Sequence, residues 1–336
     1  MAGIKQVAAR AGVSVSTVSH VINRTRFVAA ETVERVERSI AELGYAPNRA
    51  ARALAQGSNN LVGLIISDIT NPFFPDVVKG FENAAVTRGW DFFLMNTNYD
   101  PQRMTHCVER MIAQRVKGVA IMTSEFQRGL VDRLREYAIP VVALDIGTVG
   151  QYVSNITIDY EDGIRQATEH LAAMGHRSIG FICGTDRLRS HFRRRTAFEK
   201  SAKKLGMQYK VVSGEVSDTA GELAVTTLME SPRPVSAIMT ASDLIAFGAL
   251  RRLATLKKRV PEQVSLIGFD DIFFASVTQP ALTTVAILRK DLGQLAAEAL
   301  HSLSVHPSHA GTEYQVYSRL IVRQSTGPRA TSSRGA

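Results

Sequence analysis

The sequence predicts a small all-α head followed by an α/β body of two doubly wound parallel-sheet lobes. Up to about residue 46, the apolar residues recur at helical spacing, whereas from Leu61 short apolar runs alternate with amphipathic segments. The chain of 336 residues also exceeds one comfortable domain. A head and a larger body in two lobes is therefore the natural division.

Two short helical patterns, joined by residues 12–14, open the chain. Gly12 supplies the corner between them, and Ser14 is expected to cap the second helix. A third helix over 30–43 ends at Gly44. Taken alone, such a hairpin is either a structural element or a DNA-binding one. The residues expected in the core of the head share helical spacing: Val7, Ala8, Ala11, Val18, Val21, Ile22, Val33, Val36, Ile40 and Leu43.

The surroundings of this hairpin favour DNA binding. The first turns of the second helix lie where a helix-turn-helix protein presents side chains to base edges, and the loop after it adds cationic phosphate ligands. Residues 1–58 carry eight Lys or Arg against four Glu, within a chain of net charge +9. This balance predicts salt-sensitive binding to a polyanion. The candidate DNA contacts of the head are Val15, Ser16, Thr17, His20, Asn23, Arg24 and Arg26.

Several motifs together carry a specific resemblance. The block VAARAGVSVSTVSHVINRTRFV, the segment GYAPNRAARAL and the strings NPFF, IGFDD and PALTT are similar to the lac-repressor (LacI/GalR) family of bacterial transcription regulators. The similarity spans nearly the whole chain, and the head most resembles the purine and ribose repressors. The resemblance implies a periplasmic-binding-protein-like body, in which the chain crosses between the lobes three times. Because one recognition helix reads too few base pairs for useful specificity, a homodimer on a palindromic operator is expected.

Residues 47–60 are interpreted as a hinge helix and linker. The segment has good helix formers, but about two turns are too short to be stable alone, so it should order on binding. The resemblance implies that it pairs with the partner's copy and that Leu54 wedges between bases in the minor groove. The alternative is a linker helix whose Leu54 packs on the body. Asn48 and Ala51 are further candidate DNA contacts of this segment.

The body alternates apolar strands with amphipathic helices. The strand candidates are LVGLIIS, DFFLMNT, GVAIMT, PVVALD and NITID, then SIGFICG, KVVSG, AIMTAS and SLIGFDD. The expected domains are a head at 1–46, a linker at 47–60, a body at 61–326 and a disordered tail at 327–336. Within the body, lobe one takes about 61–160 and 289–318, and lobe two takes about 161–288 and 319–326.

Polar residues at the strand ends are the ligand candidates, because open parallel sheets bind ligands there. Carboxylates in such a place suit either acid–base catalysis or hydrogen bonding to sugar hydroxyls and ring N–H groups. No nucleophile elbow, glycine-rich phosphate loop or HExxH motif accompanies them, so binding is predicted and an enzyme is not. The carboxylates that follow strands are Asp68, Asp145, Asp159, Asp243, Asp270 and Asp271.

The resemblance assigns roles to some of these residues. Phe73 and Phe74 would border the effector, Arg194 matches the family's cleft arginine, and Asp270 matches its closing carboxylate. Asp145, Asp159 and Asp243 are weaker assignments. For Asp159 and Asp243 the alternative is capping of the helices that follow, and for the Phe pair it is plain core packing.

The effector is expected to be a sugar, a sugar phosphate or a sugar acid. Leu188, Val216 and Ile146 depart from the purine-repressor pattern, so a purine or nucleoside effector is the alternative. Residues 187–195 contain five arginines and a histidine. Either this is a solvated face from which only Arg194 points inward, or an anionic effector is held by Arg194 with Arg189 or Ser190.

Other classes of protein are not favoured. Cys107 and Cys183 cannot form a disulfide framework and lack metal-ligand spacing, so no metal or cofactor is expected. No signal peptide and no membrane-spanning run is seen, so we expect a cytoplasmic protein without a membrane partner. A stand-alone sugar-binding protein would account for the body but not for the helix-turn-helix head. Whether the effector induces or co-represses stays open.

Overall fold

The computed structural model describes residues 2–45, 60–123, 128–185, 188–306 and 310–330. Contacts between backbone positions divide the chain into two compact units, one up to Asn59 and one from Asn60. Apart from its last residue, the predicted linker lies outside the described residues, and so do the candidate contacts Asn48, Ala51 and Leu54.

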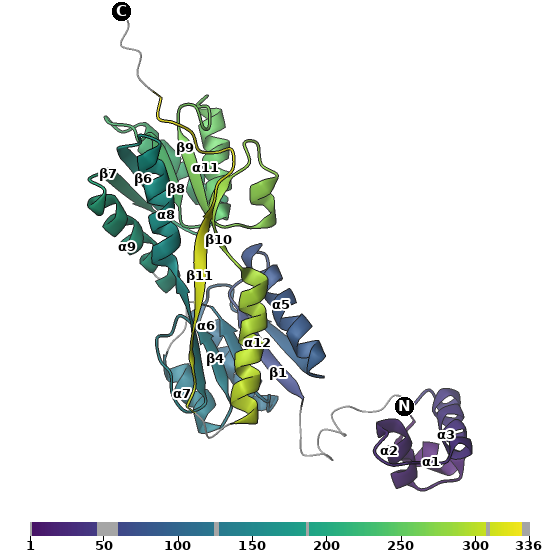
Figure 1. Cartoon of the computed structure of the whole chain (residues 1–336). Helices are drawn as coiled ribbons and strands as arrows, with labels where there is room; N and C mark the ends of the chain where they lie inside the picture. The colour runs from purple at the N-terminus through teal and green to yellow at the C-terminus, as the bar shows by residue number, and fades with distance from the viewer. Residues whose placement is uncertain (1, 46–59, 124–127, 186–187, 307–309, 331–336) are drawn as a thin grey trace, which may run out of the picture. The chain divides into compact units, whose positions relative to one another are not determined.

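The first unit is a three-helix head (Figure 1) with α1 Ile4–Ala11, α2 Val15–Asn23 and α3 Ala30–Leu43. Gly12 adopts the left-handed φ of 65° that favours glycine, and Ser14 Oγ accepts a hydrogen bond of 3.1 Å from the backbone N–H of Thr17. The predicted corner and cap are therefore confirmed. Val33 was expected in the core but is only half-buried. The core consists of Val7, Ala8, Ala11, Val18 and Val36, with Ile4, Val13, Val21, Ile22, Ile40, Leu43 and Tyr45 packed against it.

The second unit is an α/β body whose chain builds one lobe and then another. Lobe one contains β1 Leu61–Ile66, α5 Phe73–Thr87, β2 Asp91–Asn96, α6 Pro101–Ala113, β3 Val119–Met122, α7 Arg128–Glu136, β4 Val141–Leu144 and β5 Val153–Asp159. Lobe two contains α8 Tyr160–Ala173, β6 Ser178–Cys183, α9 Arg189–Lys204, β7 Gln208–Ser213, α10 Asp218–Met229, β8 Ala237–Thr240, α11 Asp243–Thr255, β9 Ser265–Asp270, the short 3₁₀ helix η1 Phe273–Ser276 and β10 Thr283–Ile287. The chain then runs through α12 Arg289–Val305 and β11 Glu313–Ile321.

The strands of both lobes are hydrogen-bonded in the order β2-β1-β3-β4-β5-β11-β10-β9-β8-β6-β7. Within the described residues, each pair of named strands is parallel except β10 with β11. Neighbouring residues of the lobe-one strands face different helix layers: Leu64 lies in the core with α5 and α12, and Ile65 in the core with α6 and α7. The predicted fold class is confirmed.

The long strand β11 belongs to both lobes (Figure 1). From Glu313 to Tyr317 it pairs with β5 of lobe one, and from Ser318 to Ile321 it pairs with β10 of lobe two. Ser318 Oγ also donates a hydrogen bond to the carbonyl oxygen of Asp159 and accepts one from the N–H of Gly163. Ser318, where β11 passes between the lobes, is therefore hydrogen-bonded to the point where the chain passes from β5 to α8.

Two close helix pairs, one in each lobe, depend on glycine. A Cβ at Gly80 of α5 would lie 2.0 Å from the carbonyl oxygen of Lys290 in α12. A Cβ at Gly248 of α11 would lie 1.7 Å from the carbonyl oxygen of Asp218 in α10. Because backbone atoms cannot move away as a flexible side chain can, these crossings exclude any larger residue.

The body continues past the point where a disordered tail was expected. Gly327 donates its N–H to Ser265 Oγ, and its carbonyl oxygen lies 3.1 Å from Nε2 of the buried His176. The N–H of Arg329 donates to the carbonyl oxygen of Met174. The expected tail boundary at 327 is therefore corrected, since these hydrogen bonds attach residues 327–329 to lobe two.

Candidate functional site

Four of the predicted DNA contacts of the head lie in the first turns of α2. Val15 is 40% exposed and Ser16 is exposed, whereas Thr17 and His20 are half-buried. The hydroxyls of Ser16 and Thr17 lie 2.7 and 2.8 Å from Ser14 Oγ. His20 Nδ1 lies 2.7 Å from Thr25 Oγ1, a hydrogen bond that fixes the ring orientation.

The end of α2 places three further predicted contacts differently. The side-chain amide of Asn23 donates to the carbonyl oxygen and hydroxyl of Ser19, so it is turned back on its own helix. Arg24 has a left-handed φ of 51° at the helix end, and both Arg24 and Arg26 are exposed. Phe27, which the sequence argument did not single out, is 96% exposed beside Arg26.

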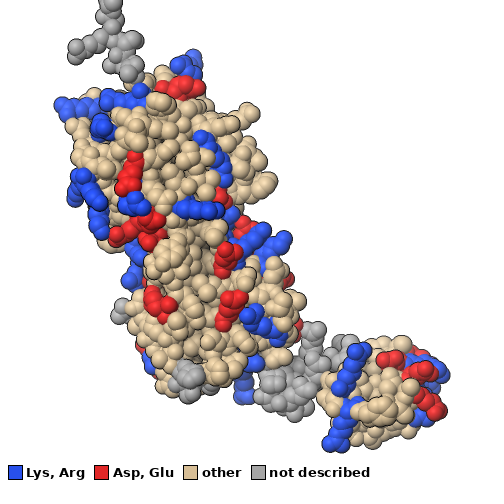
Figure 2. Space-filling model, in the orientation of Figure 1, with Lys and Arg blue, Asp and Glu red and all other residues tan. Residues whose placement is uncertain are grey.

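Charge is unevenly distributed within the head. Residues 2–29 contain no acidic residue, because the head's glutamates all lie in α3. The same segment contains four basic residues: Lys5, Arg10, Arg24 and Arg26. Figure 2 shows the acidic side chains of the head gathered on one side of the visible face. An ion pair of 2.7 Å between Arg10 and Glu42 joins α1 to α3. The half of the head that contains α2 is therefore basic, as phosphate contact requires.

In the body, a cleft of about 60 Å³, partly open to solvent, lies at the carboxyl ends of the strands. Phe73 and Phe74 line it from the start of α5, and their rings meet edge to face with centroids 5.2 Å apart. Both rings are also nearly buried, so they serve the core and the cleft at once. The full lining is Ser67, Asn71, Phe73, Phe74, Tyr99, Met122, Thr123, Leu144, Ile158, Tyr160, Leu188, Ser190, His191, Arg194, Val216, Ser242 and Asp270.

An ion pair between Arg194 of α9 and Asp270 of β9 forms the polar centre of the cleft. Arg194 Nη2 lies 3.3 Å from Asp270 Oδ1, and both side chains are nearly buried. The guanidinium also donates to the carbonyl oxygen of Ala241 and lies 3.9 Å from the ring centroid of Phe269. Burial raises the pKa of Asp270 to about 6, although the nearby Arg194 opposes this shift. The carboxyl is thus mostly ionised at pH 7.

Asp145 lies beside the cleft and is fully engaged by protein groups. Its Oδ2 accepts a hydrogen bond of 2.7 Å from the hydroxyl of Tyr160, and its Oδ1 lies 2.5 Å from Arg193 Nη1. Burial raises the pKa of Asp145, and the charge of Arg193 works against that rise. The predicted effector contact is therefore replaced in this structure by a contact between the lobes, because Arg193 belongs to α9 of lobe two.

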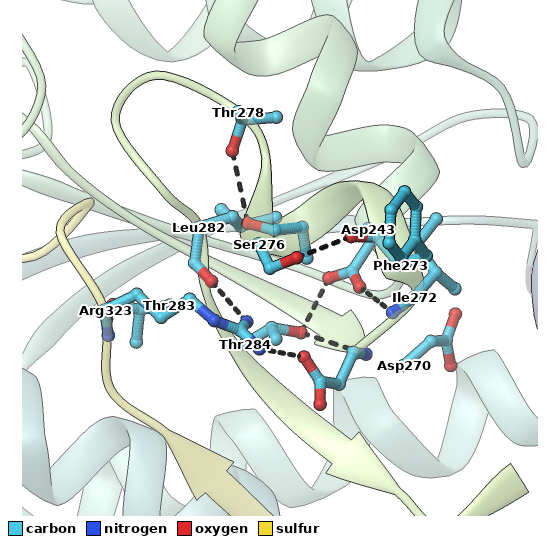
Figure 3. A network of polar contacts seen from close by, with 12 residues as sticks. Asp243, Asp270, Ile272, Phe273, Ser276, Thr278, Leu282, Thr283, Thr284 and Arg323 are labelled. Carbon is cyan, nitrogen blue, oxygen red and sulfur yellow. Dashed lines mark hydrogen bonds and ion pairs between the residues drawn. The ribbon is translucent and has the colours of Figure 1, made fainter.

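Two predicted effector residues lie away from the cleft lining. Asp159 caps α8 by accepting a hydrogen bond from the N–H of Asp162, which is the alternative considered for it. Asp243 is completely buried and accepts hydrogen bonds from Thr284 Oγ1 and from the N–H of Ile272, while Ser242 caps α11. Figure 3 shows Asp243 turned toward these groups, with the carboxylate of Asp270 apart from them. Burial raises the pKa of Asp243 well above its ordinary value.

The side chains of the arginine-rich residues 188–195 point in different directions. Ser190 and Arg194 line the cleft, whereas Arg189 does not and donates instead to the carbonyl oxygen of Ile146 in lobe one. Leu188 and Val216 line the cleft, but Ile146 does not. Of the two readings of residues 187–195, the one in which Arg194 alone among the arginines reaches the cleft agrees with the described residues.

Sequence reasoning missed several lining residues. Ser67 and Thr123 directly follow strands, and Ser242 lies two residues after the end of one, so the strand-end signal that singled out the carboxylates also applied to these hydroxyls. Tyr99 lies in the connection between β2 and α6, and His191 lies in α9. Neither residue directly follows a strand, so the strand-end signal did not mark them. Among the described residues, no cluster of three or more His, Cys, Asp or Glu side chains could hold a metal ion. None of the described helices combines the length and apolar character that crossing a bilayer demands.

Comparison with known proteins decides the family. A model of bacterial regulatory proteins of the lacI family matches residues 3–48, and a model of a periplasmic binding protein-like domain matches residues 168–326. The HTH-type transcriptional repressor PurR of Haemophilus influenzae (strain PittEE) is 33% identical over 333 residues, which cover 97% of this chain and 98% of the relative. The chain belongs to the lacI family. The resemblance predicted from its motifs is confirmed.

Solved structures agree with this assignment of the lacI-family protein. The lac repressor dimer bound to operator and the anti-inducer ONPF superimposes with a TM-score of 0.85 at 27% identity, covering 97% of this chain and 99% of that chain. The complex of the transcriptional regulator CelR with cellobiose matches with a TM-score of 0.73 at 30% identity, covering 97% and 100%. This lacI-family protein is therefore a transcriptional repressor with a DNA-binding head and a periplasmic-binding-protein-like body.

Proposed function

We propose that this lacI-family repressor binds a palindromic operator as a homodimer and that a sugar or sugar derivative in the cleft controls its affinity for DNA. The observation that carries the effector part is the nearly buried Arg194–Asp270 ion pair beside Phe73 and Phe74. A paired cation and carboxylate can hydrogen-bond two adjacent hydroxyls, while the rings pack against the apolar face of a sugar.

The head supplies the DNA-binding part of the proposal. Val15, Ser16, Thr17 and His20 lie in the first turns of a capped helix, next to a loop that carries two exposed arginines. One such helix reads too few base pairs for useful specificity, so a two-fold operator and a second copy of the chain are expected. Lobe two has exposed apolar side chains that are suited to contact with that second copy. They are Phe273 and Phe274 in η1 and Val277 directly after it.

Hydroxyl groups in the cleft favour a sugar over a nucleobase. The hydroxyls of Ser67, Thr123, Ser190 and Ser242 line the cleft, where Ser67 Oγ donates to Thr123 Oγ1 and Ser242 Oγ accepts from the N–H of Ile245. Leu188 and Val216 stand where the purine-repressor pattern has an arginine and an aromatic ring. The related regulator CelR was solved with cellobiose. A purine or nucleoside effector is the second candidate, because Phe73 and Phe74 could also stack on a base.

Control of DNA binding follows from contacts between the lobes. Arg193 binds Asp145, Arg189 binds the carbonyl oxygen of Ile146, and Arg289 binds both Asp76 of lobe one and the carbonyl oxygen of Asp270 in lobe two. A ligand that changes the angle between the lobes must rearrange these contacts. In a dimer the same change alters the separation of the segments that lead to the heads.

Selection of bound DNA from a random pool tests the proposal. The full chain is used with and without a panel of neutral sugars, sugar phosphates, sugar acids, purines and nucleosides. We expect one palindromic motif whose recovery changes with one class of sugar, and no such change in the matched variant Asp270→Asn. A motif without two-fold symmetry, or one that responds only to purines or to none of the compounds, would contradict the proposal.

A further inference from the structure

We propose that His191 is a specificity-determining residue of the cleft and that its neutral imidazole donates a hydrogen bond, through Nε2, to a hydroxyl or ring oxygen of an uncharged polyhydroxylated effector. The inference rests on the proposed function, since it needs an effector in this cleft.

His191 is an unusual residue for the place that it occupies. It lies on the first turn of α9, lines the cleft and is only 5% exposed. Its Nδ1 is buried and has no hydrogen-bond partner among the described residues. A buried polar atom without a partner costs about 1–3 kcal/mol, so such an atom in a binding cleft calls for a functional reason.

The neighbour of His191 fixes which ring nitrogen carries the proton. A Cβ at Gly184 would lie 2.0 Å from Nδ1 and 2.4 Å from Cε1, so this edge of the ring rests against the glycine backbone. No acceptor lies there for an N–H, and an unmatched buried acceptor is tolerated better than an orphaned N–H. The proton therefore belongs on Nε2, which lies farther from Gly184. The donor of this cleft-lining side chain is then the ring nitrogen that does not rest against Gly184.

Burial keeps the imidazole neutral. Burial, with a smaller contribution from the charge of Arg194, lowers the pKa of His191 to about 3. The lining then contains one cation, Arg194, and one carboxylate, Asp270, whose charges cancel within their ion pair. A phosphate or carboxylate effector would leave the cleft with a buried net negative charge, which is costly in a medium of low dielectric.

Two more buried atoms define the polar pattern that the ligand should match. Arg194 Nε is a donor without a hydrogen-bond partner among the described residues, and Asp270 Oδ1 is an acceptor that lies 3.3 Å from Arg194 Nη2 in the ion pair. With the Nε2–H of His191, the cleft offers two donors and one acceptor. A hydroxyl both donates and accepts, so two or three hydroxyl or ring oxygens of one neutral sugar can satisfy all three.

Matched substitutions of similar length test the role of His191. Gln can place an amide N–H near the position of Nε2, whereas Met has no donor. Isothermal titration calorimetry of the full chain uses a panel of neutral mono- and disaccharides, each beside its phosphate and its uronic or aldonic acid. We expect neutral sugars to bind, H191M to weaken that binding about tenfold, and H191Q to restore it to within about threefold.

A second measurement separates binding from folding. Met removes a buried nitrogen without a partner, so the ligand-free H191M chain should melt at or above the temperature of the wild type. A lower affinity with undiminished stability is a result that a merely structural role of His191 would not give. The variant Gly184→Ala, whose Cβ would collide with Nδ1, should displace the ring and weaken the same sugars.

The possible results are distinguishable. Equal affinities of H191M and wild type, or equal losses in H191M and H191Q, would overturn the role of His191. If the wild-type chain binds sugar phosphates or sugar acids and does not bind the neutral sugars, the proposed ligand class is wrong. The cleft would then still be the effector site. If no compound binds, or if D270N leaves binding unchanged, the proposed function of the cleft fails as well.

Discussion

Arg193 of lobe two and Asp145 of lobe one form a contact of 2.5 Å across the boundary between the lobes. The side chain of Asp145 is 1% exposed and that of Arg193 is 33% exposed, so the pair has one buried and one partly solvated member. The guanidinium of Arg193 also lies 4.9 Å from the ring centroid of Tyr160, whose hydroxyl donates to the same carboxylate. Two residues of lobe two, Arg193 and Tyr160, thus hold one buried charge of lobe one.

Removing the two partners of this pair should have unequal effects. Arg193→Met leaves a buried carboxylate without its cation, and we expect the free energy of unfolding to fall by about 1–3 kcal/mol. Asp145→Asn should cost less, because the freed Arg193 can turn to solvent. Urea unfolding of both variants and of the double variant measures the difference. A larger loss in D145N than in R193M would show that the buried charge is not the controlling factor.

Asp270 predicts a specific pH dependence of stability. Its pKa in the folded chain is about 6, above the ordinary 3.8, so the folded state holds the proton more tightly than the unfolded state. Its contribution to stability is full below pH 4 and is lost as the pH rises through 6. Relative to Asp270→Asn, the wild type should lose up to about 3 kcal/mol between pH 4 and 7. Parallel stability curves for the two proteins across this range would contradict the assignment.

Residues of the head should separate into two kinds by their response to salt. Arg26→Ala should weaken binding to all DNA sequences alike and reduce the slope of log affinity against log salt by about one, because it removes a phosphate ligand. Ser16→Ala should leave that slope unchanged and relax the preference for one base pair. Fluorescence anisotropy with the selected operator and point variants of it measures both. A changed slope in S16A would place Ser16 among the phosphate contacts.

Glycine substitutions should report on the close helix pairs. Gly248→Ala places a methyl group against the backbone of Asp218, and we expect it to destabilise lobe two by about 2 kcal/mol or more. Gly129→Ala is the matched control, since this helical glycine is exposed and nothing lies within 4 Å of its Cβ position. The control should stabilise the chain by about 0.5–1 kcal/mol. Calorimetric melting distinguishes the two, and similar melting temperatures would show that α10 and α11 can separate.

The sequence predicted the fold because its strands are buried on both faces. Runs such as LVGLII are apolar without alternation, and this pattern is specific to parallel strands covered by helices. The corner at Gly12 and the cap at Ser14 were predictable for a local reason, since both depend on neighbouring residues alone. Residues 327–329 were not, because a polar segment is recognised as part of the body only through partners far along the chain, such as His176.

The site was predictable in part, because position after a strand depends only on neighbouring residues in the sequence. The position after a strand placed Asp270 at the cleft, but it could not distinguish Asp270 from Asp243, whose buried carboxylate binds Thr284 of β10 instead. Nor could it show that Arg193 rather than a ligand meets Asp145, because that pairing joins residues 48 positions apart on different lobes. His191 carries no pattern in the sequence, since its role depends on the absent side chain of Gly184.

The strand β11 limits how the lobes can move. Its first half is stitched to β5 in parallel and its second half to β10 in antiparallel fashion, and both halves belong to one uninterrupted backbone. Pulling the lobes apart would strain these ladders, whereas turning one lobe about the peptide between Tyr317 and Ser318 can leave both ladders paired. The geometry of β11 therefore favours rotation of the lobes over their separation, and such a rotation rearranges the contacts of Arg193, Arg189 and Arg289.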